Sequence, residues 1–317
     1  MHKIVLFYKY LDIQDPENEM KEQRKICQSL NLKGRLIIAS EGLNGTFEGE
    51  PENISKYCQY LRAKKGYEDI HLKFSEGTGK SFPKLSIKVR KEIVSAHLGS
   101  KDLNPTQITG KYITAQQLHE WIHSDKEFYI VDMRNDYEHS VGHFAGSILP
   151  AFSNFRDLDK ILPQIEHLKD KTVVTVCTGG VRCEKASGFL VNNDFRDVYQ
   201  LFGGIVTYME QFPNQDFKGK LYVFDQRVTM GFNTEDPKHE MIGKCKKCGS
   251  LSEGFVNCTF NECHKHFICC NNCRDGENIA YCDDECRELD LRKIESMNFA
   301  LSLNNTYIDL YNALTKS

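Results

Sequence analysis

The sequence predicts an α/β domain, with a parallel sheet flanked by helices, that is preceded by an α+β domain and followed by a small cysteine-rich tail. Three observations lead to this prediction. The length of 317 residues accommodates two or three domains of roughly 100 to 200 residues each. Strand patterns alternate with helix patterns in the middle of the chain. Nine of the 13 cysteines lie between Cys245 and Cys286.

The composition excludes several classes of protein. Hydrophobic residues make up 40% and charged residues 27% of the chain, as in ordinary globular proteins, so wholesale disorder is excluded. No apolar run approaches the roughly 20 residues that span a bilayer, and the N-terminal MHKIVLFYKY becomes charged too soon for a secretory signal. We therefore expect a cytoplasmic protein with no membrane partner, whose cysteines are metal ligands, reactive thiols or buried residues.

Residues 1–95 predict the α+β domain. Apolar alternation, turn residues and helical spacing give the order β-α-β-β-α-β, which is that of the ferredoxin-like fold. The expected strands are at residues 3–10, at 35–40, after an Asn44-Gly45 hairpin turn, and at 84–93, with helices at 16–30 and around 54–61. Cys27 and Cys58 fall on the apolar faces of these helices, so we expect them in the core.

The α/β domain is expected at residues 113–220, after a linker at 96–112 that contains glycine and proline and shows little periodicity. Thr114 is placed to cap a helix that runs to Ile122. Strand patterns follow at 127–134, 172–176 and 198–204, with a helix at 184–192. Strands that alternate with helices predict a buried parallel sheet.

The most informative segment is TVVTVCTGGVRC, residues 172–183, in which a buried strand runs into a glycine-bearing loop and then a helix. This order places Cys177 at the C-terminal edge of the sheet, where α/β proteins keep their sites. The two glycines let successive N–H groups turn inward, and together with the helix N-terminus and the charge of Arg182 they stabilise an anion. These effects lower a thiol pKa from about 8.5. The candidate site is therefore Cys177 and Arg182, with an anion-binding loop of Thr178, Gly179, Gly180, Val181 and Cys183.

A lone cysteine after a strand is more often a buried apolar residue than a nucleophile. Here a cysteine, two glycines and an arginine occur within six residues, and this combination favours a reactive thiol at Cys177. Two roles remain open for Cys183: it resolves a disulfide with Cys177, or it only packs.

The middle domain resembles the rhodanese domain. Asp132-Met-Arg134 with Glu138 and the GHFAG of residues 142–146 resembles the first signature of that family, and CTGGVR resembles its active-site loop. The resemblance implies a persulfide carried by the loop cysteine. The Cys-x4-Arg spacing argues against the related phosphatases, whose Cys-x5-Arg loop is wider. We expect Asp132, Arg134 and His143 to give structural support, the first two by orienting the loop and the last by anchoring a turn.

The whole chain resembles the bacterial tRNA uridine(34) hydroxylases. The resemblance rests on EGLNGT (41–46), FPKLSIKVRKEIV (82–94), CTGGVRCEKAS (177–187) and the cysteine-rich tail. It implies oxygen-dependent conversion of the wobble uridine to 5-hydroxyuridine, with the tRNA anticodon loop as partner, molecular oxygen as co-substrate and the loop cysteine as the essential thiol. A dinucleotide fingerprint and a two-His-one-carboxylate iron site are not evident, so no nucleotide cofactor is expected.

Basic residues are concentrated in the first domain. Residues 1–95 hold 17 Lys/Arg and 13 Asp/Glu, a net of +4 in a chain whose total is −3, and residues 60–91 hold nine basic and three acidic residues. Such a surface is equally typical of ordinary solvation and of phosphate contact. Given the resemblance, we expect RNA contact, with Lys80, Lys84, Lys88 and Arg90 as candidates.

The C-terminal region, residues 221–317, contains four closely spaced cysteine pairs, a strong zinc signal because two pairs complete one tetrahedral site. We expect two structural zinc ions, held by Cys245, Cys248, Cys258, Cys263, Cys270, Cys273, Cys282 and Cys286. Sequential and cross-braced pairing both remain open, and His264 or His266 could replace a cysteine. Disulfides and an iron–sulfur cluster are the alternatives to zinc.

Two other functions remain possible. The loop length also suits a sulfurtransferase that moves sulfur from a small thiol or a persulfide donor protein to an acceptor. The rhodanese fold and the tail would also suit a non-catalytic adaptor, although the presence of both Cys177 and Arg182 argues against it.

Overall fold

The computed structural model describes residues 2–274 and 279–298 of the chain. The chain divides into two compact units, residues 1–241 and 242–317, and each is described here by itself. Within the described residues, no helix combines the length and apolar character that crossing a membrane requires. The end of the predicted cysteine-rich region, residues 299–317, lies outside the described residues.

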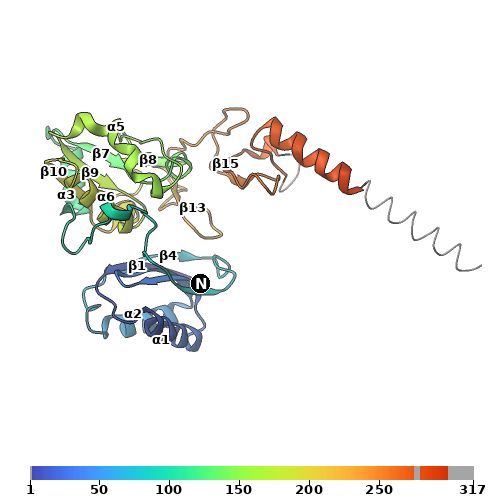
Figure 1. Cartoon of the computed structure of the whole chain (residues 1–317). Coiled ribbons are helices and arrows are strands. Elements are labelled where there is room, and N and C mark those ends of the chain that lie inside the picture. Colours follow the sequence, from blue (N-terminus) through green and yellow to red (C-terminus); the bar gives the residue numbers. More distant parts are fainter. Residues whose placement is uncertain (1, 275–278, 299–317) are drawn as a thin grey trace, which may run out of the picture. The chain divides into compact units, whose positions relative to one another are not determined.

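The N-terminal part of the first unit is a five-stranded sheet with both of its helices on one face (Figure 1). The strand order is β4-β1-β3-β2-β5, and β5 runs parallel to β2 while the other pairs are antiparallel. The elements are β1 (His2–Tyr10), α1 (Pro16–Ser29), β2 (Lys33–Ala39), β3 (Gly42–Gly49), α2 (Pro51–Arg62), β4 (Lys73–Gly77) and β5 (Leu85–Val89). Cys27 and Cys58 are buried against this sheet, which confirms their predicted place in the core.

The predicted hairpin turn at Asn44-Gly45 is wrong. Both residues lie inside β3, and the turn that joins β2 to β3 falls at residues 40–41. Gly45 serves packing instead, because a Cβ atom there would lie 2.7 Å from the side chain of Leu36 and 2.8 Å from that of Phe7. Asn-Gly is a hairpin signal only where the chain must reverse, and here the sheet needs a small residue in mid-strand.

The predicted last strand of the ferredoxin-like order is also wrong. The fourth strand of that order is β4. The segment predicted for that place, residues 84–93, contains β5 instead, a fifth strand at the edge of the sheet beside β2. The sequence analysis missed β4 because its segment KFSEG has a single apolar residue and begins with a lysine that the fold buries. The ferredoxin-like arrangement itself is present in β1 to β4 with α1 and α2.

The second part of the first unit is the predicted α/β arrangement around a four-stranded sheet. The strand order is β6-β10-β9-β7, and every pair in it is parallel, which confirms the buried parallel sheet. The larger elements are β6 (Lys111–Ile113), α3 (Ala115–Ile122), β7 (Tyr129–Asp132), α4 (Asp136–His139), β8 (Gly142–Phe144), η2 (Phe155–Ile161), α5 (Leu162–Ile165), η3 (Glu166–Leu168), β9 (Thr172–Val176), α6 (Val181–Val191), β10 (Asp197–Leu201) and α7 (Gly204–Gln211). Short pairings follow in β11 (Phe217–Gly219), β12 (Leu221–Tyr222) and β13 (Thr229–Met230), and η1 (Gly99–Lys101) lies in the expected linker. Thr114 caps α3, as predicted, through a capping box with Gln117.

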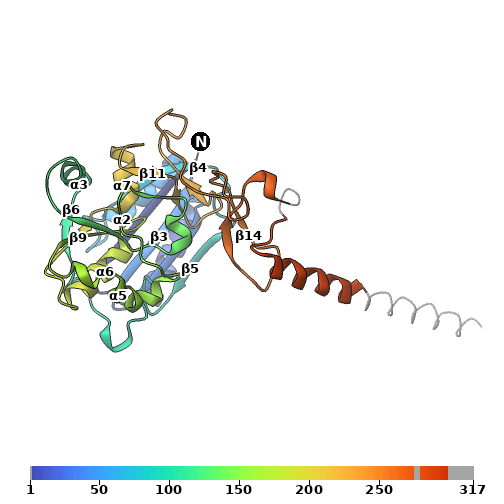
Figure 2. The same ribbon diagram turned by 90° about the horizontal axis from the view of Figure 1, so that it is seen from above.

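Two hydrophobic clusters cover the two faces of this sheet, as the surrounding helices in Figure 2 indicate. Val173 belongs to the cluster with Phe155 of η2 and Phe189 of α6, whereas the next residue of β9 packs with residues of α3 and α7. Successive residues of a strand point to opposite faces, so a continuous apolar strand such as β9 is buried on both sides. The central position of β9 fixes the loop that follows it.

Helix α6 begins earlier than the predicted residue 184. It starts at Val181, because Gly180 adopts a left-handed conformation (φ +100°) that closes the loop within three residues. Arg182 and Cys183 therefore lie in the first helical turn rather than in the loop.

The second unit is small and has little regular structure. It contains β14 (Phe255–Asn257) paired with β15 (His266–Ile268), η4 (Asn271–Cys273) and a helical stretch at 284–298. Its buried cluster consists largely of cysteines with Phe260, Phe267 and Tyr281. So few large apolar groups give a small core, which is typical of domains that a metal stabilises.

Candidate active site

Cys177 directly follows the central strand β9, and the loop folds back over its sulfur. The amide of Gly180 donates a hydrogen bond to the Cys177 Sγ at 3.2 Å. A Cβ atom at Gly204 would lie 2.6 Å from the Gly180 nitrogen, so α7 can approach the loop only through a glycine. Cys177 itself is fully buried.

The environment of Cys177 favours the thiolate. Burial alone raises the pKa, but the thiol of Cys183, the charge of Arg182 and the amides of Cys183 and Gly180 together lower the pKa of Cys177 from 9.0 to about 6. Cys183 is buried as well, and burial together with the neighbouring Cys177 raises its pKa, so it acts as a neutral hydrogen-bond donor.

A buried carboxylate, which the sequence analysis did not single out for a role, holds Arg182 in place. Glu138 accepts two hydrogen bonds from the guanidinium, at 2.6 and 2.8 Å, and is completely buried. Arg182 also donates to the Thr178 Oγ1 at 3.3 Å. Burial lowers the pKa of Arg182, but the charge and hydrogen bonds of Glu138 have the larger effect, so the pKa of Arg182 lies above its ordinary value. The role of Glu138 could have been inferred from its position in the first rhodanese-like signature, four residues after Arg134.

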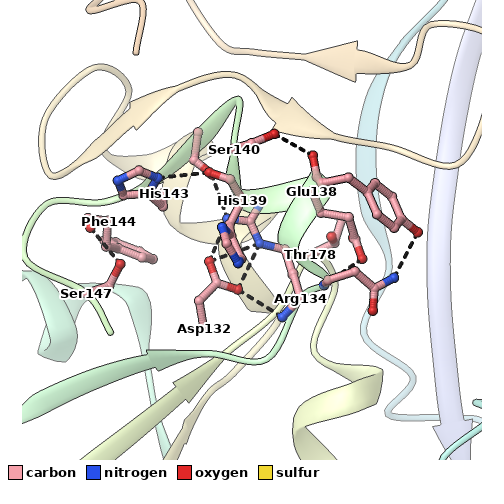
Figure 3. Close-up of polar contacts among 12 residues, drawn as sticks. Asp132, Arg134, Glu138, His139, Ser140, His143, Phe144, Ser147 and Thr178 are labelled. Carbon is pink, nitrogen blue, oxygen red and sulfur yellow. Dashed lines mark hydrogen bonds and ion pairs between the residues drawn. The ribbon is translucent and has the colours of Figure 1, made fainter. Parts of the chain in front are cut away.

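The predicted supporting residues lie close to one another and to Glu138, as Figure 3 shows. Arg134 donates from Nε and Nη2 to the carboxylate of Asp132 and from Nη2 to the Gly142 carbonyl, at 2.6 to 3.1 Å. Both side chains of this ion pair are fully buried. His143 contacts the His139 carbonyl through Nδ1 at 2.9 Å. These contacts join the end of β7 to α4 and β8, and α4 carries Glu138.

The N-terminal sheet supplies a second cation to the loop. Lys73 at the start of β4 is 3% exposed, and its Nζ donates to the Gly179 carbonyl at 2.8 Å. Its ammonium lies 4.7 Å from the ring centre of Tyr8. Burial lowers the pKa of Lys73 to about 8, while the charges of Cys177 and Glu184 oppose that change. In the sequence, Lys73 is one of the nine basic residues of 60–91, and nothing there distinguishes it from a surface lysine. Only the fold brings it to this loop.

Glu184 and Lys185, part of the EKAS extension of the loop motif, bind residues of the N-terminal domain, the linker and β6. Glu184 accepts hydrogen bonds from the hydroxyls of Tyr8 at 2.9 Å and Tyr112 at 3.0 Å. Lys185, which is fully buried, pairs with Glu41 at 2.9 Å and with Asp102 at 3.1 Å. The extension therefore serves to hold the N-terminal sheet and the linker against α6.

A cavity of about 120 Å³ lies beside the loop. Thr178 and Val206 line it on one side, and residues of β1 to β4 together with the hairpin of β12 and β13 complete it. Cys177 is not in the lining, so the cavity reaches the neighbour of the sulfur rather than the sulfur itself.

The four candidate RNA-contacting residues, Lys80, Lys84, Lys88 and Arg90, are all exposed. The aromatic residues of the same segment are not all available for stacking, because Tyr67 and Phe82 are 3% exposed. The ammonium of Lys64 forms an ion pair with the carboxylate of Glu19 at 2.7 Å.

The eight predicted cysteine ligands gather in two groups of four within the second unit. Cys245, Cys248, Cys270 and Cys273 form one group, and Cys258, Cys263, Cys282 and Cys286 form the other. The Sγ atoms of each group lie within 4.8 Å of one another, and neighbouring pairs such as Cys263 and Cys282 are 3.5 Å apart. A tetrahedral ion with bonds of about 2.3 Å needs sulfurs about 3.8 Å apart, so both groups fit a metal ion.

The grouping settles the pairing that spacing left open. The first cysteine pair joins the third and the second joins the fourth, which is the cross-braced arrangement. Neither His264 nor His266 belongs to a group, and Cys269 is buried outside both.

One further group of possible metal ligands in the described residues was not found from the sequence. His119 on α3 and His123 at its C-cap lie beside Asp216, with contacts of 3.0 and 3.1 Å between nitrogen and carboxylate oxygen. Tyr208 donates its hydroxyl to the same carboxylate. The carboxylate of Asp216 therefore already accepts hydrogen bonds from protein groups. The sequence does not reveal this group, because Asp216 lies far along the chain from the two histidines.

Three family descriptions match the chain. Residues 2–93 match the UPF0176 acylphosphatase like domain, residues 114–211 the Rhodanese-like domain, and residues 218–287 the Rhodanase C-terminal region. These matches agree with the ferredoxin-like and rhodanese folds described above.

Relatives similar over almost the whole length carry one name. The chain is 40% identical over 287 residues to the tRNA uridine(34) hydroxylase of Cytophaga hutchinsonii, covering 90% of each chain. It is 38% identical over 295 residues to that of Staphylococcus carnosus, covering 88% of this chain and 92% of the relative. A rhodanese-like domain protein of known structure from Staphylococcus aureus is 28% identical over 31% of this chain and 90% of its own, with a TM-score of 0.27.

Proposed function

The chain belongs to the tRNA uridine(34) hydroxylase family, and on this premise we propose that it converts the uridine at position 34 of tRNA to 5-hydroxyuridine, with Cys177 as the reacting group. The observation that carries the proposal is a cysteine with a pKa of about 6, held by an inward-facing amide and a fixed arginine, in a chain 40% identical to a named relative. Arg182, the amides of Gly180 and Cys183, and the thiol of Cys183 stabilise the charge on that sulfur.

The reaction replaces the C5–H bond of the uracil ring by C5–OH, which is a two-electron oxidation. Molecular oxygen is the proposed co-substrate. One oxygen atom enters the base, and the other leaves as water with two protons and two electrons that an external reductant supplies. The protein's part is to hold the nucleotide, unstacked from the anticodon loop, beside the sulfur; unstacking costs least in a single strand.

The anticodon loop of tRNA is the proposed partner, in the cytoplasm. Lys80, Lys84, Lys88 and Arg90 support this proposal, since all four are exposed and the last two lie in or just after the edge strand β5. Exposed cations at such positions can contact phosphates without sequence readout.

Zinc is the proposed metal for the two cysteine groups, and its role is structural. Four thiolates complete the tetrahedral coordination that zinc prefers and leave no position for a water molecule, so the sites stabilise the fold of the second unit.

The test compares tRNA from strains that carry the wild-type protein, Cys177→Ser or Cys27→Ala as their only copy. Cys27→Ala is the control because that cysteine is a core residue of the N-terminal sheet. Mass analysis of the tRNA is expected to show loss of 5-hydroxyuridine only with Cys177→Ser. Purified protein under ¹⁸O₂ is expected to place the heavy isotope in the base. Unchanged 5-hydroxyuridine with Cys177→Ser would remove the role proposed for this sulfur.

A sulfurtransferase is the second candidate, because the rhodanese-like match includes the CTGGVR loop. In that reaction a small donor or a persulfide donor protein leaves a sulfane sulfur on Cys177, which an acceptor then removes. Rapid conversion of thiosulfate and cyanide to sulfite and thiocyanate, with tRNA unaffected by Cys177→Ser, would favour this candidate over hydroxylation.

A further inference from the structure

The cavity beside the loop lies between two sets of elements that are far apart in the sequence. Leu6 of β1 and Thr178 of the loop both line it, and Phe224, between β12 and β13, forms part of the opposite wall. The hairpin of β12 and β13 is tied to the N-terminal sheet, because Arg227 donates to the Ser75 hydroxyl and the Glu76 carbonyl at 2.9 Å. The cavity is therefore built by both parts of the first unit.

The size and walls of the cavity limit what it can hold. At about 120 Å³ it is well below the roughly 300 to 1,000 Å³ of pockets for drug-sized ligands and cofactors. Most of its lining is apolar, with Ile4, Val206 and Met230 among the residues. Losing hydration against such walls costs a small dianion such as thiosulfate far more free energy than it costs a neutral planar ring.

Three phenylalanines line the cavity, and Phe74 of β4 is half-buried. Phe82 is buried, but Phe224 is 48% exposed although its ring belongs to the lining. The guanidinium of Arg182 lies 5.9 Å from the ring centre of Phe224. A flat ring stacked on Phe224 would thus lie close to the residue that neutralises Cys177.

Polar groups of the lining match the edge of a pyrimidine. Thr178 and Ser75 offer hydroxyls, and Arg35 and Lys73 are donors, while uracil presents two carbonyl acceptors and one N–H donor. The cations also suit the negative backbone of a nucleic acid.

We propose that this cavity receives the unstacked uracil ring of the substrate nucleotide, with Phe224 as its stacking partner. The inference rests on the proposed function, and it names where the base lies when it is presented to the loop. Phe224 is a positioning residue, because it contacts the ring and not the sulfur. Thr178, which directly follows Cys177, is the part of the loop that borders the cavity.

The first experiment locates the base. An anticodon stem-loop RNA with 4-thiouridine at position 34 is irradiated with the full-length protein, and the crosslinked peptides are identified by mass spectrometry. The expected crosslinks fall in residues 221–230 or at Phe82, and an RNA carrying the photoactive base in its stem gives none there. Crosslinks confined to other segments would overturn the proposal.

The second experiment tests stacking. Replacing Phe224 by alanine is expected to reduce kcat/KM for the stem-loop about tenfold or more, mainly through KM, because base–aromatic stacking is lost. Phe224→Trp keeps a stacking face and is expected to retain activity. Val191→Ala is the control, because Val191 of α6 is 40% exposed and lies outside the cavity lining. The pH titration of the Cys177 thiolate should be the same in all four proteins. Wild-type kinetics in Phe224→Ala would contradict stacking.

The two experiments separate the failure of the inference from that of the proposed function. If the wild-type protein forms no 5-hydroxyuridine, the proposed function fails and the crosslinks still report where position 34 lies. If it forms 5-hydroxyuridine but neither the crosslinks nor Phe224→Ala behave as expected, the cavity is not the base site and the function stands.

Discussion

At the scale of single residues, the sulfur of Cys177 lies among cations held by different parts of the chain. Arg182 comes from α6 and is fixed by Glu138, while Lys73 comes from β4 and binds the loop through the Gly179 carbonyl. Opposite charges nearby favour the ionised form of a thiol, so each contact has a measurable effect on the thiolate.

The lowered pKa of Cys177 predicts the pH range in which the thiolate exists. The difference in thiolate ultraviolet absorbance between the wild type and Cys177→Ser should rise with a midpoint near pH 6. A depressed pKa stabilises the folded state fully above the ordinary value of about 9, and this contribution is lost as the pH falls through about 6. A midpoint near 9 would show that the loop does not stabilise the anion.

Replacing Lys73 by methionine should raise the pKa of Cys177. The substitution keeps an unbranched chain but removes the buried ammonium, whose charge interacts with the Cys177 thiolate. We expect the absorbance midpoint to move upward by about one unit or less. Lys80→Met, at an exposed position, is the matched control and should leave it in place. A midpoint that stays near pH 6 in Lys73→Met would exclude Lys73 from the electrostatics of the site.

Glu138→Gln should destabilise the protein by leaving Arg182 as a buried charge without its counter-ion. Breaking one side of a buried pair costs about 3 kcal/mol or more of the free energy of unfolding. Urea unfolding monitored by circular dichroism measures the change. The double variant Glu138→Gln with Arg182→Met should recover part of the loss, because the unpaired charge is then gone. No recovery would mean that the cost comes from packing.

At the scale of elements, the loop after β9 depends on the strand that crosses it. β1 places Leu6 and Tyr8 against the two loop glycines: a Cβ atom at Gly179 or Gly180 would lie 2.8 Å from Leu6 or Tyr8 respectively. The two positions differ in one respect, since only Gly180 has a positive φ.

This difference predicts unequal effects for neighbouring substitutions. Gly180→Ala combines a strained backbone with a clash against the Tyr8 hydroxyl and should cost about 1–3 kcal/mol of the free energy of unfolding. Gly179→Ala meets only the flexible end of Leu6 and should cost less. Urea unfolding and the Cys177 absorbance titration measure both effects. Equal effects would indicate that the loop changes its conformation to accommodate either alanine.

Most elements could be predicted from the sequence, and the errors have physical causes. β9 and the Thr114 cap are local patterns, and the structure confirms them. The Asn44-Gly45 turn and the missed β4 depend on neighbouring strands, which no local pattern reveals. The position of Cys177 could be predicted because strand, glycines and arginine are contiguous. Glu138 and Lys73 reach the site only through the fold, from 39 and 104 residues before Cys177.

At the scale of the whole molecule, the buried cluster of the second unit consists largely of the grouped cysteines, whereas apolar side chains make up the clusters of the first. In the cross-braced grouping, residues 258–263 lie between the two cysteine pairs of the first group, and residues 270–273 lie between the two pairs of the second group. Loss of one site then loosens the segment that closes the other.

Substitution of one ligand should therefore reduce binding at both sites. Cys258→Ala is expected to lower the zinc content of the full-length protein, measured by elemental mass spectrometry, from two ions per chain towards none rather than to one. Cys269→Ala is the matched control, since this neighbouring cysteine belongs to neither group, and it should retain two ions. The Cys177 titration should stay unchanged in both variants, because that site lies within the first unit. Exactly one retained ion in Cys258→Ala would show that the two sites fold independently despite their interleaved ligands.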